Sequence, residues 1–517
     1  MRRPNRIFTA AAISLLITLL TLSLSFFSFA EENATLSFAP DPMTEGVPGY
    51  TAGTVTVTKG TKSLKSGWYA LCFADDKGTL DGYEAIARVP IASGDTTEIP
   101  LPYGMYLPPK ATRLVLFEGA TKGIAIGKID KAVASFDLPQ STLDLGKAEF
   151  TFASVSDVHL NYDDHGYGAS PKWTAALNFF AEKKMDIVVM TGDMTESGGK
   201  TDYERYKKAV EASSYPANQI YEAKGNHDSP ENTLFLKYTV DENTDQVHPY
   251  PGSPYFHLLK KGEEGQRDNL FIFMAQELSA TGNTASEENF SETQLDWLED
   301  LLVRYAGKNT NIFIIEHSLM RNFGPGDRIN GAYGGPILLE ERFDGHMRFK
   351  ELLTEYKEAI LMSGHTHLSL YELLNFSDER GSAARMIHNS SVSQPRSYTA
   401  SGTISYNSEG ATTATKGSEG YLVYVYSDHI LYVGYNLTTG KIIPAACYLM
   451  KAYDEDRSEV SDISLKTAPK KTEYAVGEWF SGEGMEIEAT LKDGSKKIVS
   501  GWGVSKVGAL TEDDTFV

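Results

Sequence analysis

Five polar motifs, each placed just after an apolar run, constrain the fold of this chain more than any other feature. The run over residues 186–191 shows the pattern most clearly, because it contains four large apolar residues in succession and is followed at once by Gly192 and Asp193. An unbroken apolar run of this length is typical of a strand that is buried on both faces, as in a parallel sheet. In open α/β folds, ligands bind at the carboxyl ends of such strands. The sequence therefore predicts an α/β sheet with one polar site along its carboxyl edge.

The five motifs carry carboxylate, amide and imidazole side chains. In chain order they are Asp157-Val158-His159, Gly192-Asp193-Met194-Thr195-Glu196, Gly225-Asn226-His227-Asp228, a single His317 after an apolar run, and Gly364-His365-Thr366-His367. Four motifs follow a predicted strand directly, and the motif at Gly225 follows its strand one residue later. One Asp-x-His or Gly-Asn-His-Asp alone is more often a turn than a site. Five of them at successive strand ends indicate a shared metal site.

Three oxygen ligands and four imidazoles are enough to hold two metal ions that share one carboxylate. The predicted ligands are Asp157, His159, Asp193, Asn226, His317, His365 and His367. Asp193 ends the most apolar strand and is the natural bridge between the ions. A set of nitrogen and oxygen ligands without thiolate fits Mn, Fe, Zn, Co or Ni better than Ca or Mg. The motifs therefore predict a two-metal hydrolase.

The set of motifs resembles the calcineurin-like metallophosphoesterases over roughly residues 150–450. That family carries D-x-H, G-D-x-x-[DE], G-N-H-[DE], H and G-H-x-H in this order, and no member of the pattern is missing here. The resemblance implies an α/β fold, the αββα sandwich of that family, in which a metal-bound hydroxide attacks phosphorus. It assigns one ion to Asp157, His159, Asp193 and His367, and the second to Asp193, Asn226, His317 and His365. It also implies that His227 assists the leaving oxygen and that Glu196 or Asp228 orients the His227 ring.

Two branches of that family fit this sequence less well. Purple acid phosphatases carry a Tyr near the position of Glu196 and lack a His at position 159. Protein Ser/Thr phosphatases continue the second motif with Asp-Arg-Gly, which is absent here. Three further polar residues outside the motifs lie in predicted loops, namely His165, Arg321 and Arg328. For each of them we predict a solvent-exposed side chain, with a substrate contact as the alternative. For His388, which follows an apolar run, a core position or a contact behind the ligands is predicted.

The rest of the chain divides by composition. Residues 1–30 begin with three Arg, continue with an apolar stretch and end in a small-x-small pattern typical of a cleavage site. This order predicts a signal peptide, and an uncleaved membrane anchor is the alternative. Residues 31–148 alternate strand and turn signals and predict an all-β sandwich. The motifs belong to a domain over residues 149–450, in which residues 396–420 are predicted to form a long exposed loop.

The C-terminal part is predicted to begin with a charged linker over residues 451–461. Residues 462–517 resemble a bacterial Ig-like repeat that stops before its last strands. This resemblance implies a spacer or a contact with the cell wall. The two cysteines, Cys72 and Cys447, are predicted to be buried free thiols.

Length and charge limit the possible partners. The chain has 517 residues, enough for three or more domains, and a net charge of −21. Such a surface repels polyanions, so no nucleic-acid binding surface is expected. The sequence thus predicts a secreted or cell-surface phosphoesterase with two divalent ions, Mn, Fe or Zn, that hydrolyses a small phosphodiester. A phosphomonoesterase or nucleotidase is the alternative, and a non-catalytic surface-binding protein on the same scaffold is the second alternative.

Overall fold

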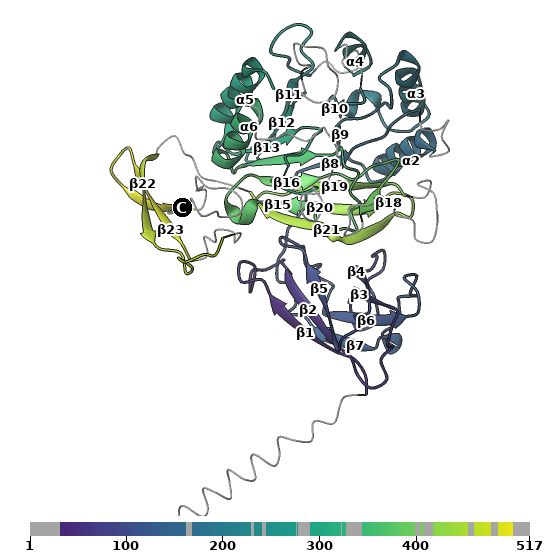
Figure 1. Ribbon diagram of the computed structural model, residues 1–517. Helices are drawn as coiled ribbons and strands as arrows, with labels where there is room; N and C mark the ends of the chain where they lie inside the picture. The colour runs from purple at the N-terminus through teal and green to yellow at the C-terminus, as the bar shows by residue number, and fades with distance from the viewer. Residues whose placement is uncertain are drawn as a thin grey trace, which may run out of the picture.

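The computed structural model describes most of the chain after the predicted signal peptide. The described residues are 32–161, 168–228, 232–239, 245–275, 277, 290–321, 323–326, 344–398, 404–406, 417–452, 460–476 and 484–499. The signal peptide, His165 and Arg328 lie outside them. Figure 1 shows an N-terminal β part, a central part with both helices and strands, and a C-terminal β part.

The central part contains two six-stranded sheets. The first, the β8 sheet, has the order β10-β9-β8-β19-β20-β21. Its strands are β8 (Phe150–Val155), β9 (Ile187–Met190), β10 (Ile220–Glu222), β19 (Glu419–Val425), β20 (His429–Asn436) and β21 (Lys441–Lys451). Strands β8, β9 and β10 are parallel, and β19 to β21 extend the sheet with antiparallel pairs.

The second sheet, the β13 sheet, has the order β11-β12-β13-β14-β16-β15. Its strands are β11 (Phe256–Lys260), β12 (Asp268–Phe273), β13 (Thr310–Ile315), β14 (Ala359–Ser363), β15 (Phe376–Ser377) and β16 (Arg385–His388). Strands β12, β13, β14 and β16 run parallel. The two edge strands β11 and β15 are antiparallel to their neighbours.

Each sheet buries one face against the other sheet, and helices cover the opposite face of the β13 sheet and of β8 to β10. Ile187 and Val189 of β9 pack between the sheets, beside Phe313 of β13, whereas Val188 and Met190 face the helices. The helices on this side are α2 (Ala169–Glu182), α3 (Lys200–Glu211) and α4 (Asn232–Thr239), and those on the β13 sheet are α5 (Glu292–Tyr305) and α6 (Asp344–Glu355). This is the αββα arrangement that the family resemblance implied. Because both faces of β9 are buried, every residue of this strand is apolar.

The N-terminal part consists of two antiparallel sheets that share one core. The first has β1 (Thr35–Pro40), β2 (Gly53–Thr58) and β5 (Thr96–Leu101); the second has β4 (Ala87–Pro90), β3 (Trp68–Ala74), β6 (Arg113–Gly119) and β7 (Ala134–Asp137), with a 3-10 turn η1 (Ile129–Lys131) before β7. Val55 and Ile99 of the first sheet belong to the same buried cluster as Tyr69 and Leu114 of the second. The predicted β-sandwich has this architecture.

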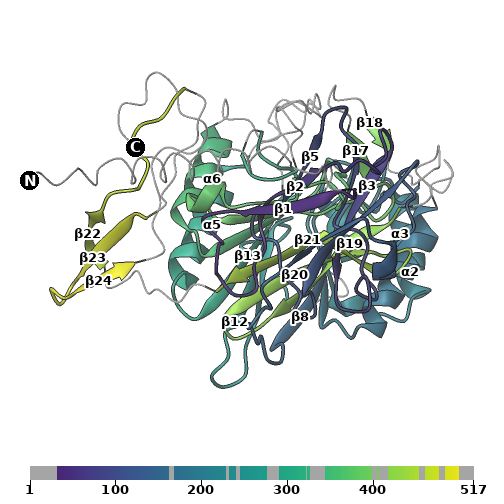
Figure 2. The ribbon, with the colours of Figure 1, turned by 90° about the horizontal axis from the view of Figure 1, so that it is seen from below.

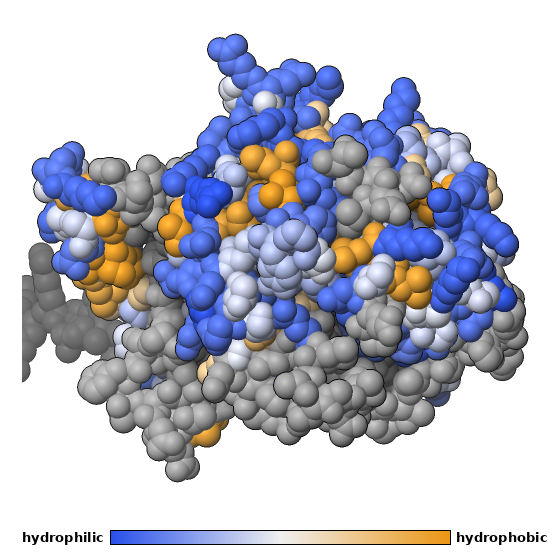
Figure 3. Space-filling model, turned by 90° about the horizontal axis from the view of Figure 1, so that it is seen from above, coloured by the Kyte–Doolittle hydropathy of each residue, from blue (hydrophilic) through white to orange (hydrophobic). Residues whose placement is uncertain are grey.

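The sandwich packs against the outer face of β20 and β21. Tyr50, Tyr106 and Leu143 contact the cluster formed by Leu431, Val433, Cys447 and Leu449. Backbone hydrogen bonds join the two parts, from Tyr106 N to Cys447 O at 2.8 Å and from Leu449 N to Gly104 O at 3.1 Å. Figure 2 shows the N-terminal strands lying across β20 and β21. On the opposite face, the described residues in Figure 3 are mainly hydrophilic, with small separate apolar patches.

The structure differs from the sequence prediction in several connecting segments. The predicted loop over residues 396–420 contains an antiparallel pair, β17 (Arg396–Tyr398) and β18 (Ile404–Tyr406). Its Ser and Thr content hid Tyr398, Ile404 and Tyr406, which are residues that favour strands. Short 3-10 turns, η3 (Ala217–Gln219) and η4 (Glu379–Gly381), lie before β10 and after β15.

The C-terminal part forms a three-stranded antiparallel sheet of β22 (Val460–Thr467), β23 (Glu486–Leu491) and β24 (Lys496–Val499). Its assignment as an Ig-like repeat stays a prediction, and residues 453–459 of the predicted linker lie outside the described residues. Cys72 in β3 and Cys447 in β21 are buried free thiols, as predicted. Within the described parts of the chain, no helix has the length and hydrophobicity that a membrane span requires.

Candidate metal centre

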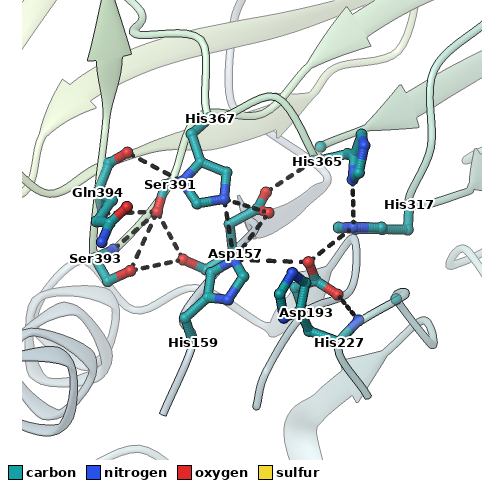
Figure 4. Close-up of polar contacts among 12 residues, drawn as sticks. Asp157, His159, Asp193, His227, His317, His365, His367, Ser391, Ser393 and Gln394 are labelled. Atoms are coloured by element: carbon teal, nitrogen blue, oxygen red, sulfur yellow. Dashed lines mark hydrogen bonds and ion pairs between the residues drawn. The ribbon is translucent and has the colours of Figure 1, made fainter. Parts of the chain in front are cut away.

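The five motifs meet at the carboxyl ends of strands from both sheets. Asp157 and His159 follow β8, Asp193 follows β9, and Asn226 follows β10; His317 follows β13, and His365 and His367 follow β14. Figure 4 shows the aspartate and histidine side chains of this set turned toward one another. The side chains form three overlapping groups, and within each group the ligand atoms lie within 4.8 Å of one another. The groups are Asp157 with His159 and His367, Asp193 with His317 and His365, and His159 with Asp193 and His227. The predicted ligands therefore share one site although 210 positions separate the first from the last.

The first ligand group is centred on Asp157. Its Oδ1 lies 3.0 Å from His367 Nε2 and 3.4 Å from His159 Nε2. The two Nε2 atoms are themselves 3.0 Å apart. Asp193 Oδ2 lies 3.6 Å from His159 Nε2, so the Asp193 carboxylate borders this group as well.

The second ligand group lies on the other side of Asp193. The same Oδ2 atom is 3.0 Å from His317 Nε2. Asn226 Oδ1 lies 2.9 Å from both His317 Nε2 and His365 Nδ1. Because one oxygen of Asp193 faces both groups, it is placed where a bridging carboxylate is needed.

Hydrogen bonds on the outer side of the rings fix which nitrogen faces inward. The outward Nδ1 atoms of His159, His317 and His367 lie 2.8, 2.8 and 3.1 Å from Glu196 Oε2, Thr191 O and Gln394 O. A neutral imidazole has one N–H, and donating it outward leaves a lone pair on the inward Nε2 atom. Inward lone pairs beside carboxylate and amide oxygens form a donor set that a cation fills. The residues therefore fit two divalent ions.

Burial and mutual charge set the protonation of these groups. Burial opposes ionisation of Asp157 and Asp193, but neighbouring histidines, His367 for Asp157 and His317 for Asp193, hold the pKa of each carboxyl well below its usual range. Burial likewise disfavours a charged ring, yet the carboxylates raise the pKa of His159 to about 9 and that of His317 to about 10. Each ion would therefore take the place of a proton at its site.

The backbone at five of the seven predicted ligands adopts left-handed conformations. The φ values are 54° for Asp157, 51° for His159, 54° for Asp193, 73° for His365 and 56° for His367. Non-glycine residues rarely adopt this region, and each instance costs on the order of 1–3 kcal/mol. Such strain persists only where the surroundings enforce it, which is typical of functional sites.

The motif glycines leave space for this packing. A Cβ atom at Gly225 would lie 2.2 Å from Asp193 Oδ1, and one at Gly364 would lie 2.0 Å from Ser156 Oγ. Side chains at these positions would push the ligands apart. This is the physical reason for a glycine at the start of the third and fifth motifs.

His227 lies at the open side of the centre. Its side chain is 38% exposed, whereas that of His317 is fully buried. The ring lies 4.8 Å from that of His159, measured between centroids, and its backbone N–H donates to Asp193 Oδ1 at 2.8 Å. This position suits a group that meets a substrate entering from solvent.

The surroundings of His227 differ from those that the resemblance implied. Its Nδ1 donates to the backbone carbonyl of Glu196 at 2.7 Å, whereas the Glu196 carboxylate lies 3.9 Å away and bonds to His159 instead. Asp228 accepts from the backbone N–H groups of Asp193, Thr195 and Gly225. Asp228 therefore joins the second and third motifs and does not orient the His227 ring.

The sequence prediction missed a polar segment that follows β16. In it, Gln394 O accepts from His367, and Ser391 Oγ donates to Asp157 O at 2.7 Å. The signal was the same as in the five motifs, a polar run after a strand, but after His388 it carries no carboxylate or imidazole. His388 is buried, as predicted, with Nε2 2.9 Å from Gly364 O and from Thr366 Oγ1.

Comparisons with known proteins agree with this geometry. Residues 150–369 match the family model described as calcineurin-like phosphoesterase. Over 85 residues, 16% of this chain and 32% of the relative, the chain is 32% identical to the "Probable cyclic nucleotide phosphodiesterase" of Synechococcus sp.. Over 195 residues, 36% of this chain and 57% of the relative, it is 26% identical to the "Probable glycerophosphodiester phosphodiesterase GpdQ" of Arcobacter nitrofigilis. The matched segments thus span about a third of the length of the first relative and just over half of the length of the second.

Among solved structures, a dimetal phosphatase from Danio rerio is similar, with a TM-score of 0.41 and 14% identity over 59% of this chain and 100% of that chain. The family match covers all five motifs and both ligand groups. The part of the chain over residues 150–369 is a calcineurin-like phosphoesterase domain.

Proposed function

We propose that this protein is a metal-dependent phosphoesterase that hydrolyses a small phosphodiester. The observation that carries the proposal is the pair of buried ligand groups that share Asp193 inside the phosphoesterase domain. Asp157, His159, Asp193 and His367 would hold one ion, and Asp193, Asn226, His317 and His365 the other. Two divalent ions at this place supply Lewis acidity toward phosphoryl oxygens and lower the pKa of water. Mn, Fe and Zn all suit the donor set.

The protein's own groups orient the reaction. The Glu196 carbonyl and the contact with the His159 ring fix the His227 imidazole at the open side of the centre. In its imidazolium form, His227 would donate a hydrogen bond or a proton from Nε2 to the oxygen that leaves phosphorus, while Nδ1–H stays on the Glu196 carbonyl. Asp228 keeps the loops of Asp193 and His227 together through three backbone N–H groups.

The preference for a diester is supported by the names of the two curated relatives, both called phosphodiesterases. A phosphomonoesterase or nucleotidase could use the same centre, and it is the alternative. We further propose that the protein is exported, because of the Arg-led apolar segment at its N-terminus. The scaffold alternative, a surface-binding protein without turnover, conflicts with the complete ligand set.

The deciding experiment compares turnover of an aryl phosphodiester with turnover of the matching monoester. The protein is loaded with Mn²⁺ or Zn²⁺, and its ion content is measured in the same samples. Faster hydrolysis of the diester supports the proposal, and faster hydrolysis of the monoester supports the alternative. A protein that holds two ions and cleaves neither ester would favour the scaffold alternative. The Asp193→Asn variant is the matched control for activity that does not come from this centre.

A further inference from the structure

Residues 391–394, which follow β16, lie behind the first ligand group. Ser391 and Ser393 are fully buried, and Gln394 is 2% exposed. The backbone of the segment runs beside the end of β8, where Val392 N donates to Ser156 O at 3.0 Å. Gln394 carries an amide oxygen like that of Asn226, but this oxygen accepts from Arg396 Nη2 at 2.8 Å. Their contacts are with the ligands themselves.

The hydroxyl of Ser391 holds the backbone of Asp157. Ser391 Oγ donates to Asp157 O at 2.7 Å and accepts from the backbone N–H groups of Gln394 at 2.8 Å and Ser393 at 3.1 Å. Ser393 Oγ donates to the same Asp157 carbonyl at 3.2 Å. Two hydroxyls thus bond to the carbonyl of a residue whose φ is 54°. A strained backbone of this kind needs such support.

The same segment holds His367. Gln394 O accepts the outward N–H of the His367 ring at 3.1 Å, and Arg396 N donates to His367 O at 2.7 Å. His367 also has a left-handed backbone, with a φ of 56°. One short segment therefore positions both Asp157 and His367, whose ligand atoms lie 3.0 Å apart.

The second ligand group has different supports. His317 donates to Thr191 O, which lies at the end of β9. Asn226 contacts His317 and His365 directly. Among the described residues, the bonds of the 391–394 segment that reach a ligand go to the first group alone. The two ion sites therefore have different outer contacts, although the backbone N–H of His365 donates to Asp157 Oδ2 at 3.0 Å.

We propose that Ser391 is a positioning residue that sets the affinity of the first ion site and leaves the second site largely unaffected. The inference rests on the two-ion centre of the proposed function. With the Ser391 hydroxyl removed, the Asp157 carbonyl loses its shorter hydrogen bond, and the two N–H groups of Ser393 and Gln394 lose their shared acceptor. The Gln394 carbonyl then no longer holds the His367 ring in place. Changes of this kind behind metal ligands typically weaken metal affinity roughly 10- to 100-fold.

The test is a titration of the ion-free full-length protein with Mn²⁺. Calorimetry measures the heat of each binding step, and electron paramagnetic resonance measures the concentration of free Mn²⁺. His367→Ala and His317→Ala identify which binding step belongs to which site. Ser391→Ala is expected to weaken the step that His367→Ala removes by roughly 10- to 100-fold, with the other step within about threefold. Ser154→Ala is the matched control, because Ser154 is a buried serine of β8 whose hydroxyl bonds to Asn389 at 2.9 Å and to no ligand.

The outcomes separate this inference from the proposed function. Equal weakening of both steps, or of neither, in folded Ser391→Ala would overturn the role of Ser391. If Ser391→Ala does not fold, Ser393→Ala is measured instead; its bond to Asp157 O is longer, so a smaller loss at the same step is expected. A wild-type protein that binds no Mn²⁺ or Zn²⁺ would instead refute the two-ion centre itself.

Discussion

Three of the four ligand histidines use their two ring nitrogens for different tasks. The inward nitrogen of His159, His317 and His367 faces a carboxylate, and the outward nitrogen donates to an acceptor that belongs to the protein. The outward acceptor holds the outward N–H, so the inward nitrogen is the one that releases its proton and binds an ion without a turn of the ring. The ligand types could be predicted from sequence, but the acceptors could not, because two of the three are backbone carbonyls that any residue could provide.

Asp193 should be the residue on which both ions depend. Its Oδ2 atom lies 3.0 Å from His317 and 3.6 Å from His159, so one charge serves both ligand groups. Asp193→Asn is therefore expected to lower the occupancy of both sites, whereas His365→Ala should lower that of the second alone. Metal content after dialysis, measured by mass spectrometry, distinguishes these results. Two ions retained in Asp193→Asn would count against a bridging role.

His227 should matter for turnover and not for ion binding. It is half-exposed and makes its ring contacts with Glu196 O and His159. His227→Ala is expected to keep both ions and to lose turnover by roughly 10²–10⁴, the usual contribution of an acid–base group. Rates are measured alongside metal content. A variant with near-normal rates would exclude the proposed role in leaving-group assistance.

Ion binding should release protons, and its affinity should rise with pH. In the ion-free protein the carboxylates raise the pKa of His159 to about 9 and that of His317 to about 10. At pH 7 both rings therefore carry a second proton and a positive charge. An ion must displace these protons, so the apparent affinity should fall as the pH drops below about 10 at the site of His317 and below about 9 at the site of His159. Each displaced proton contributes up to roughly tenfold per pH unit. Calorimetry in buffers of different ionisation enthalpy counts the protons, and a count of zero at pH 7 would contradict the expectation.

At the scale of elements, the site is made by the turns that end parallel strands. The strands β8, β9, β13 and β14 were all predicted from apolar runs, and the motifs after them contain the ligands. Local patterns were sufficient here because strand and ligand adjoin in the sequence. The segment after β16 was missed because its hydrogen bonds go to distant partners such as Asp157 and His367. The local pair β17 and β18 was missed because the Ser and Thr content of residues 396–420 hid it.

The turn before His365 should not tolerate a side chain at Gly364. A Cβ atom there would lie 2.0 Å from Ser156 Oγ and 2.8 Å from Asp157 Oδ2. Gly364→Ala is therefore expected to displace the ligands and to lower the unfolding free energy by about 1–3 kcal/mol, as overpacking does. Gly94→Ala, where a Cβ atom meets nothing within 4 Å, is the matched control. Adding Ser156→Gly to Gly364→Ala should recover part of the loss in thermal unfolding and in metal content, and no recovery would argue against this clash.

At the scale of the whole molecule, the N-terminal sandwich acts as a cover for the β8 sheet. Helices cover the outer face of β8 to β10, but the outer face of β20 and β21 carries Leu431, Val433, Cys447 and Leu449 and is covered by the sandwich. The existence of a β domain could be predicted from its strand and turn signals. Its docking could not, because the apolar residues of β20 and β21 are equally compatible with a helix layer on that face.

The docking of the sandwich should contribute to the stability of the phosphoesterase domain. Leu143 packs against the β20 and β21 cluster, so Leu143→Asp places a charge at an apolar contact. We expect a loss of about 1–3 kcal/mol in unfolding free energy and a lower melting temperature, with turnover per folded molecule unchanged because the metal centre lies at the strand ends. Val47→Asp is the matched control, since Val47 is an apolar residue of the same domain that is 44% exposed. Differential scanning calorimetry of both variants decides the question, because equal melting temperatures would show that the sandwich and the β8 sheet do not stabilise one another.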